Sequence, residues 1–231
     1  MSSSSTADGK LTLHHLNHSQ SQRILWLCEE LSAAYPSTFS YTLVNHFRNH
    51  MKQAPDSLKA VSPSGKAPCL VLPNGRRLNE SVAIINYLLR AYDVEGKFGG
   101  IAQLELDAPH AVSSAEDAPD AVREDELVSH AATTLGSIVQ MCFVLQIIPP
   151  MSPWVLRPVL RLMFGGMVAG LRPFVGEAMR WWEERLEGRE YVSGNLGGGE
   201  CGRADFVVEF PMSMVSGQRQ GSLAQWTSMG C

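Results

Sequence analysis

The 231-residue sequence lacks the signatures of several common classes of protein. Its five cysteines form no CxxC pair and its histidines form no HExxH, so their spacing predicts no metal site of these types. Acidic residues outnumber basic ones by 23 to 19, which gives a net charge of −4. A nucleic-acid binder needs a basic surface to neutralise phosphates, so this balance argues against that class.

Neither a secretory signal nor a membrane-spanning segment is apparent. Residues 1–9 are polar and are expected to form a disordered tail. The scattered cysteines are then expected to be reduced thiols of a cytoplasmic protein. No apolar run reaches 18 residues without interruption, so no spanning helix is predicted. The apolar-rich stretch 138–175 is broken by prolines and arginines, which favours a helical hairpin that is buried or touches a membrane.

The first half of the chain, residues 10–95, alternates strand-like runs with helical periodicity. Apolar residues recur at helical spacing after Ser21 and again after Ser81, which predicts a helix at each place. A Pro-Asn-Gly sequence at 73–75 is typical of a tight turn, and residues 44–60 are expected to be a loop with a short helix. The predicted strands are Leu11–Leu16, Phe39–Leu43, Pro68–Leu72 and the short return strand Arg77–Leu78.

The second half shows no strand-like segment. Residues 96–119 are rich in Gly, Ala, Pro, Asp and Ser and form the predicted linker. Residues 120–231 are expected to form an all-helical domain, in which the glycine run at 197–199 is a flexible connection and not a phosphate loop. The predicted helices are residues 127–146, 158–175, 177–186 and 205–215.

Three stretches of the chain resemble the glutathione S-transferase family, and the resemblance covers nearly the whole chain to about Met214. They are LTLHHLNHSQSQRILWLCEEL (Leu11–Leu31), SPSGKAPCLVLPNGRRLNESVAIINYLL (Ser62–Leu89) and EYVSGNLGGGECGRADFVVEFPM (Glu190–Met212). The sequence SQRILWLCEEL and the apolar segment 152–175 are most similar to a fungal subgroup with membrane-associated members.

The resemblance implies an α/β plus all-α fold, with a thioredoxin-like N-terminal domain at 10–95 and an all-helical C-terminal domain at 120–231. It also implies a homodimeric, cytoplasmic detoxification enzyme of fungal type, with peripheral contact to the endoplasmic reticulum membrane. In such an enzyme the glutathione thiolate attacks an apolar electrophile. Glutathione is then a co-substrate, and no metal or redox cofactor is required.

Glu80 and Ser81 are the first two candidate glutathione-binding residues. Ser81 stands where a helix begins, and its hydroxyl with the nearby backbone N–H groups can bind a carboxylate. By resemblance, this would be the γ-glutamyl carboxylate, and Glu80 would pair with the ammonium of the same unit. The plain alternative for Glu80 is an acidic residue that the helix dipole stabilises.

Three residues around the start of the predicted third strand complete the candidate binding site. By resemblance, Pro68 follows a cis peptide bond, and the backbone of Ala67 pairs with the cysteinyl unit of glutathione as an added strand does. Lys66 would reach the glycyl carboxylate. A trans proline that starts a strand and a solvated lysine are the alternatives.

The thiol of glutathione must be ionised near neutral pH, although free thiols have a pKa of about 8.5. A hydrogen-bond donor beside a helix N-terminus lowers that pKa. In the loop before the first helix, Ser19 is the leading catalytic candidate, with Asn17, His18 and Ser21 as rivals; a serine here is also an ordinary helix cap. The loop has neither Tyr nor Cys, so the tyrosine and cysteine mechanisms cannot be carried over, and thiol-transferase chemistry is disfavoured.

The remaining candidates concern the electrophile pocket and the core. Cys28 and Cys69 fall on apolar faces and are expected to be inert packing residues. Flexible or aromatic side chains suit a pocket for varied apolar substrates, although the same pattern is also typical of plain core. The candidates for this pocket are Met141, Phe143, Trp154, Phe164 and Met167.

The last predicted helix and the residues that follow it depart from the family pattern. Asp205 is expected to cap its own helix, but Gly202 stands where the family usually has Ser or Thr. The family generally continues with further helices, whereas residues 216–231 are polar and aperiodic. A non-catalytic glutathione-fold binding or regulatory protein is therefore an alternative, as is a membrane-surface protein anchored by residues 138–175.

Overall fold

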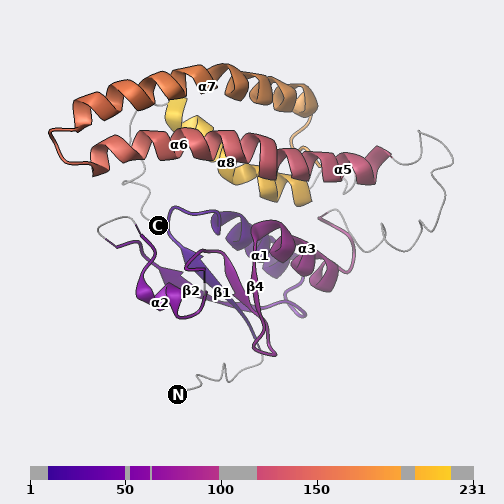
Figure 1. The fold of residues 1–231 in the computed structure, drawn as a ribbon. Coiled ribbons are helices and arrows are strands. Elements are labelled where there is room, and N and C mark those ends of the chain that lie inside the picture. The colour runs from indigo at the N-terminus through magenta and orange to yellow at the C-terminus, as the bar shows by residue number, and fades with distance from the viewer. Residues whose placement is uncertain (1–9, 50–52, 63, 99–118, 194–200, 220–231) are drawn as a thin grey trace.

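A computed structural model describes residues 10–49, 53–62, 64–98, 119–193 and 201–219. A sheet domain lies against a helical domain, and the two pack into one body (Figure 1). This confirms the α/β plus all-α fold. The predicted tail at 1–9, most of the predicted linker at 96–119 and the polar end at 220–231 lie outside the described residues.

The sheet has four strands in the order β2-β1-β3-β4. Strand β1 (Leu11–Leu16) is parallel to β2 (Tyr41–His46) and antiparallel to β3 (Cys69–Val71), which is itself antiparallel to β4 (Arg77–Asn79). The second strand starts two residues later than expected and runs three further. It is paired with β1 along its whole length, from Tyr41 opposite Leu11 to His46 opposite Leu16, and this pairing sets its bounds.

Helices α1 (Gln22–Ala34) and α3 (Ser81–Tyr92) lie between the sheet and the helical domain (Figure 1). Each buries an apolar stripe in the common core, as the helical periodicity predicts. The expected short helix is α2 (Asp56–Lys59). Cys28 in α1 and Cys69 in β3 are fully buried. Burial raises the pKa of the Cys28 thiol to about 12, so it stays protonated and inert, as expected.

The helical domain is built on a long hairpin above α8 (Arg203–Arg219) (Figure 1). Its first arm runs without a break through α5 (Pro119–Ser129), the π-helical segment η1 (His130–Leu135) and α6 (Gly136–Met151). The second arm is α7 (Arg157–Leu186).

The expected break at residue 176 is wrong, because α7 continues through Gly176 to Leu186. Pro173 lies inside α7, as it does in the predicted helix 158–175, and it removes the donor to the carbonyl of Ala169, which is an exposed residue.

Two stretches are long and apolar enough to cross a membrane, judged by length and composition only. They are Val122–Met151, with mean hydropathy 1.7, and Arg157–Leu186, with mean hydropathy 1.3. The prediction that no helix spans a membrane therefore stays a prediction. In the structure the two stretches pack against each other as the arms of the hairpin.

Asp205 anchors the start of α8, as the sequence predicts. Its carboxylate accepts hydrogen bonds from the N–H groups of Gly202 at 2.9 Å, Val192 at 2.8 Å and Ser193 at 3.2 Å. A Cβ at Gly202 would lie 2.3 Å from the Cβ of Ser193, so a serine or threonine does not fit there. The hydroxyl of Ser193 instead donates to Glu124 in α5 at 3.1 Å. The missing side chain at 202 thus makes room for Ser193, whose bond joins the segment after α7 to α5.

Candidate active site

A cavity of about 560 Å³ lies where the ends of β1, α1, β3 and α3 meet the helical domain. All five residues expected to bind glutathione line it: Lys66, Ala67, Pro68, Glu80 and Ser81. Side chains of α6 and α8 close the opposite wall. The structure therefore brings together residues that the sequence placed in two separate segments.

The Ala67–Pro68 peptide bond is cis, as the resemblance implied. Pro68 is buried and Ala67 half-buried where the chain enters β3, while Lys66 is exposed at the rim.

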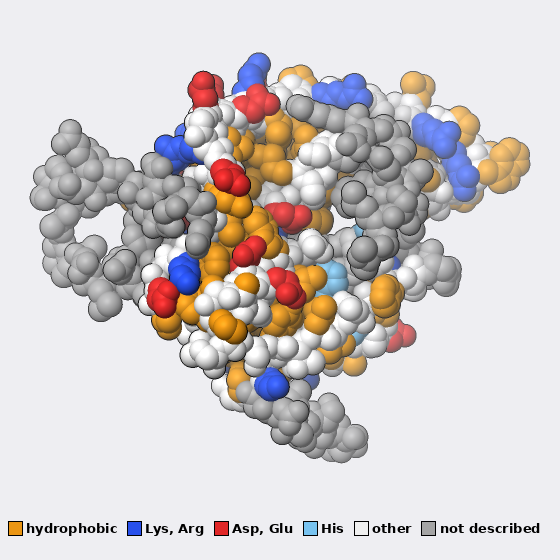
Figure 2. All heavy atoms as spheres, turned by 180° about the vertical axis from the view of Figure 1, so that it is seen from behind, with side chains coloured by type: hydrophobic (Ala, Val, Ile, Leu, Met, Phe, Trp, Pro, Cys, Tyr) orange, Lys and Arg blue, Asp and Glu red, His pale blue; other side chains and the backbone are white. Residues whose placement is uncertain are grey.

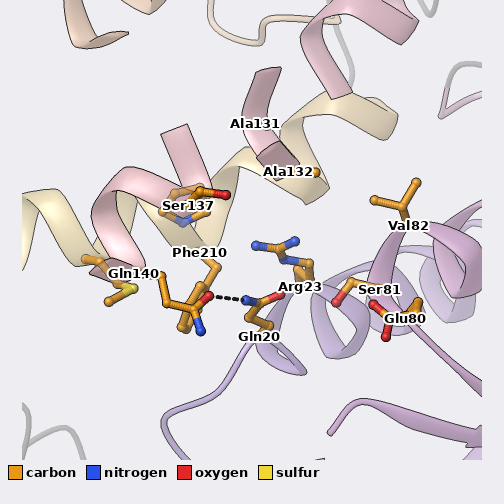
Figure 3. Close-up of a pocket in the computed structure, with 13 residues that line it drawn as sticks. Gln20, Arg23, Glu80, Ser81, Val82, Ala131, Ala132, Ser137, Gln140 and Phe210 are labelled. Atoms are coloured by element: carbon orange, nitrogen blue, oxygen red, sulfur yellow. Dashed lines mark hydrogen bonds between the residues drawn. The ribbon is translucent and has the colours of Figure 1, made fainter. Parts of the chain in front are cut away.

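Glu80 and Ser81 stand at the N-terminus of α3. Ser81 is buried and is the first residue of the helix, so its hydroxyl lies among backbone N–H groups that have no helical acceptor. Glu80 is exposed and has φ +71°, a left-handed conformation that is unfavourable for a residue with a side chain. The two side chains lie side by side at the cavity wall (Figure 3). Together they present donors for a carboxylate and an acceptor for an ammonium group.

The loop before α1 is tied to the end of β1 by two serines. Ser21 is fully buried, and its hydroxyl accepts the N–H of Leu16 at 3.1 Å and lies 2.9 Å from Nδ1 of His15. The hydroxyl of Ser19 donates to the carbonyl of Leu16 at 2.7 Å and accepts the N–H of Ser21 at 3.2 Å. Ser21 precedes α1, but its hydroxyl caps no N–H of the helix. Both serines therefore fasten the loop to β1.

The catalytic candidates of this loop differ in their access to the cavity. Ser19 and His18 line it, and His18 has φ +50°. Asn17 is not part of the described lining, because its amide oxygen accepts the N–H of Arg48 at 2.8 Å. Ser21 lies behind Ser19 and is not part of the lining either.

Sequence reasoning did not assign Arg48 to the site, although it lies in the polar stretch noted after the second strand. Its guanidinium donates to the carbonyls of Asn17 and His18, both at 3.2 Å, and the residue lines the cavity. Burial lowers the pKa of Arg48. A basic residue in the loop that follows β2 was the available signal, but nothing local showed that this loop folds back on β1.

Most of the expected electrophile-pocket residues lie elsewhere. Phe143 lines the cavity, but Met141 and Met167 are 53% and 52% exposed and Trp154 is 78% exposed; none of these three is part of the lining. Phe164 is half-buried and is not in the lining either. The prediction is wrong for these four because the hairpin extends beyond the cavity. The apolar wall comes instead from Phe143 with Phe210 and Met214 of α8.

The histidines of β1 and β2 form a hydrogen-bonded chain. Nδ1 of His14 lies 2.9 Å from Nε2 of His46, whose Nδ1 lies 3.0 Å from the hydroxyl of Ser57. Among the described residues, no group of three or more His, Cys, Asp or Glu side chains could hold a metal ion.

Residues 19–91, which include the loop before α1, the cis proline and the start of α3, match the family model of the glutathione S-transferase N-terminal domain. By this match, the chain contains an N-terminal domain of the glutathione S-transferase type. Glutathione S-transferase 3 of Schizosaccharomyces pombe is 35% identical over 82 residues, which are 36% of this chain and 31% of that protein. Glutathione S-transferase 1 of Saccharomyces cerevisiae is 32% identical over 88 residues, 36% of this chain and 35% of that protein. The match thus spans about a third of each relative.

Solved glutathione S-transferase structures share the whole fold. One from Actinobacillus pleuropneumoniae is 25% identical, with a TM-score of 0.59, over 94% of this chain and 82% of that one. The glutathione transferase URE2P6 of Phanerochaete chrysosporium, solved with oxidized glutathione, is 17% identical, with a TM-score of 0.61, over 96% of this chain and 86% of that one. The thioredoxin-like N-terminal domain expected from the sequence is confirmed.

Proposed function

We propose that this protein is a glutathione transferase that binds glutathione in the 560 Å³ cavity and conjugates the whole tripeptide, through its thiolate sulfur, to an apolar electrophile. The observation that carries the proposal is the convergence of Lys66, Ala67, Pro68, Glu80 and Ser81 on that one cavity. Two similar structures were solved with glutathione or its oxidised form, which supports the choice of ligand.

Each part of the tripeptide has a counterpart in the cavity. The hydroxyl of Ser81 and the N-terminus of α3 bind the γ-glutamyl carboxylate, and the carboxylate of Glu80 binds the ammonium group. The backbone of Ala67 pairs with the cysteinyl unit. Lys66 and Arg48, the basic residues of the cavity wall, are proposed to bind the glycyl carboxylate. In this proposal glutathione is the co-substrate, and no metal or redox cofactor takes part.

Ser19 is the proposed thiolate stabiliser. It lies on the cavity wall just before α1, where the helix N-terminus also favours a negative charge. Its single hydroxyl proton is directed to the carbonyl of Leu16, so a thiolate must compete for that proton. His18, also on the wall, is the rival donor, whereas Asn17, whose amide oxygen accepts the N–H of Arg48, is not part of the described lining.

Calorimetry with glutathione, followed by a conjugation assay with 1-chloro-2,4-dinitrobenzene, tests the proposal. The wild type should bind and turn over, and the double variant Glu80→Ala/Ser81→Ala should lose most of its affinity. Glu183→Ala, which removes an exposed glutamate of α7, is the matched control and should bind normally. Undiminished affinity in the double variant would show that the site is wrongly assigned.

A non-catalytic glutathione-binding or regulatory protein is the second candidate. The observation in its favour is that the hydroxyls of Ser19 and Ser21 already bond to each other and to β1. In that case glutathione binds in calorimetry, but no conjugate forms with chlorodinitrobenzene or with a second, softer electrophile such as an α,β-unsaturated ketone. Conjugation above the uncatalysed rate excludes this candidate.

We also propose that the free end of the hairpin touches a membrane surface. Large apolar side chains are exposed there, among them Trp154 at 78% and Leu162 at 80%. No acidic residue occurs between 127 and 176, whereas Arg157 and Arg161 are present. Figure 2 shows this end projecting at the upper right, with apolar and basic side chains together. Such a surface fits anionic lipids.

Sedimentation with vesicles tests this contact. Vesicles containing phosphatidylserine should bind the protein more than pure phosphatidylcholine, and Leu162→Glu should abolish binding while glutathione affinity is kept. Equal recovery of wild type and variant in the supernatant contradicts the contact. The homodimer and the cytoplasmic location expected from the resemblance stay predictions, which size-exclusion chromatography with light scattering and cell fractionation would check.

A further inference from the structure

A second cavity, of about 160 Å³, adjoins the candidate glutathione site. It lies between the two domains, among α1, the start of α3, η1, α6 and α8 (Figure 3). The two cavities share six lining residues, so the smaller one, the inner cavity, is continuous with the larger. The shared residues are Gln20, Glu80, Ser81, Gln140, Phe210 and Met214.

Arg23, the second residue of α1, brings a positive charge into this inner cavity. The side chain is only 4% exposed, yet its guanidinium lies among the residues that line the cavity (Figure 3). Its Nε has no hydrogen-bond partner among the described residues. A buried guanidinium with an unfilled donor costs free energy, unless a ligand or a partner fills it.

The nearest acidic counterpart in the fold leaves the guanidinium incompletely paired. Glu209 of α8 interacts electrostatically with Arg23, but its own Oε2 is buried and unpartnered as well. Burial raises the pKa of Glu209, which weakens it as a permanent counter-charge. Burial lowers the pKa of Arg23 to about 10, which leaves the guanidinium charged at neutral pH. Its other neighbour is the ring of Phe210, with Cζ 5.7 Å from the ring centroid.

The rest of the inner wall suits the body of a small organic acid. Val82, Ala131, Phe210 and Met214 supply apolar surface, and a guanidinium is the side chain that best matches a planar carboxylate. Glu80 is the one acidic group that lines the cavity among the described residues, and it sits at the exposed rim, where the ammonium of bound glutathione would neutralise it.

We propose that Arg23 is a specificity-determining residue that binds a carboxylate carried by the electrophile. This inference rests on the proposed transferase function, because glutathione in the outer cavity presents its sulfur to a substrate whose acidic end occupies the inner one. It narrows the substrate class from apolar electrophiles in general to electrophiles with an apolar body and an anionic end. The γ-glutamyl carboxylate of glutathione is the competing source of the same chemistry, but the start of α3 already provides donors for it.

Two glutathione conjugates separate these sources in a binding measurement that needs no turnover. Calorimetry compares S-(4-carboxybenzyl)glutathione with S-benzylglutathione, which differ only in the carboxylate. The wild type should prefer the acidic conjugate by about tenfold, the scale of one charge-assisted hydrogen bond. Arg23→Met should remove the preference and keep the affinity for S-benzylglutathione. Arg23→Lys should retain part of it, and Glu209→Gln, which keeps the cation, should retain all of it.

Three results would overturn the inference. A wild type that binds both conjugates equally has no anion subsite but keeps the proposed function. If Arg23→Met loses affinity for both conjugates to the same extent, Arg23 binds the glutathione part that the two conjugates share. A wild type that binds neither conjugate refutes the proposed function, and the inference with it. If Arg23→Met does not fold, the double variant Arg23→Met/Glu209→Gln removes both buried charges and takes its place, with circular dichroism as the check on folding.

Discussion

The hydroxyl oxygens of Ser19 and Ser21 lie 2.7 Å apart, and both also reach the carbonyl of Leu16 at the end of β1. This pair joins the first strand to the first helix beside the cavity. Of the two, Ser19 faces the cavity and Ser21 is sealed behind it. Their substitutions should therefore have different effects.

Ser21→Ala should mainly reduce stability. It leaves the buried N–H of Leu16 without its acceptor, which costs about 1–3 kcal/mol. Ser19→Ala should lower the conjugation rate much more than it lowers stability. Urea unfolding and chlorodinitrobenzene kinetics measure the two effects, with Ser32→Ala, a half-buried serine in α1, as control. The assignment is wrong if Ser19→Ala keeps full activity.

Glu80 has both a proposed binding role and a strained backbone conformation. Comparing two substitutions should separate the two effects. Glu80→Gly relieves the φ of +71° and should raise stability by up to about 1 kcal/mol, while glutathione affinity falls. Glu80→Gln should lose similar affinity with no gain in stability. Thermal unfolding and calorimetry on both variants give the comparison. An affinity unchanged in both would remove Glu80 from the site.

Gly202→Ala should destabilise the protein by about 2 kcal/mol, because the new Cβ would lie 2.3 Å from that of Ser193. Adding Ser193→Gly should recover part of the loss, and a double-mutant cycle measures that coupling. Gly166→Ala, in an open part of α7 with nothing within 4 Å, is the matched control and should stabilise slightly. Additive losses would show that the two positions do not meet.

Acidification should weaken the fold through His14. Burial, the charge of His46 and the charge of Arg77 lower the pKa of His14 from 6.5 to about 4. Between these values the unfolded chain binds a proton that the folded chain does not, so the free energy of unfolding should fall as the pH drops from 6.5 towards 4. His14→Gln should flatten this slope in urea unfolding at a series of pH values. An equally steep slope in the variant would assign the effect to other groups.

Much of the fold follows from local pattern. The bounds of β1, the start of α3 at Ser81 and the turn before β4 agree with sequence expectation, because apolar periodicity and turn residues act over a few positions. The continuity of α7 through Gly176 does not follow from local pattern. A glycine inside a helical pattern weakens the helix without necessarily ending it, and packing decides the outcome.

The amino-acid sequence by itself determined that a helix starts at Ser81 after an acidic residue and that a proline opens the third strand; by resemblance, these are parts of one binding site. Only the tertiary structure decided which side chains reach the cavity. It turned Asn17 toward Arg48, carried Trp154 to the free end of the hairpin and buried Arg23 between domains. Exposure and pairing depend on what packs against a residue from distant parts of the chain, which local sequence does not encode.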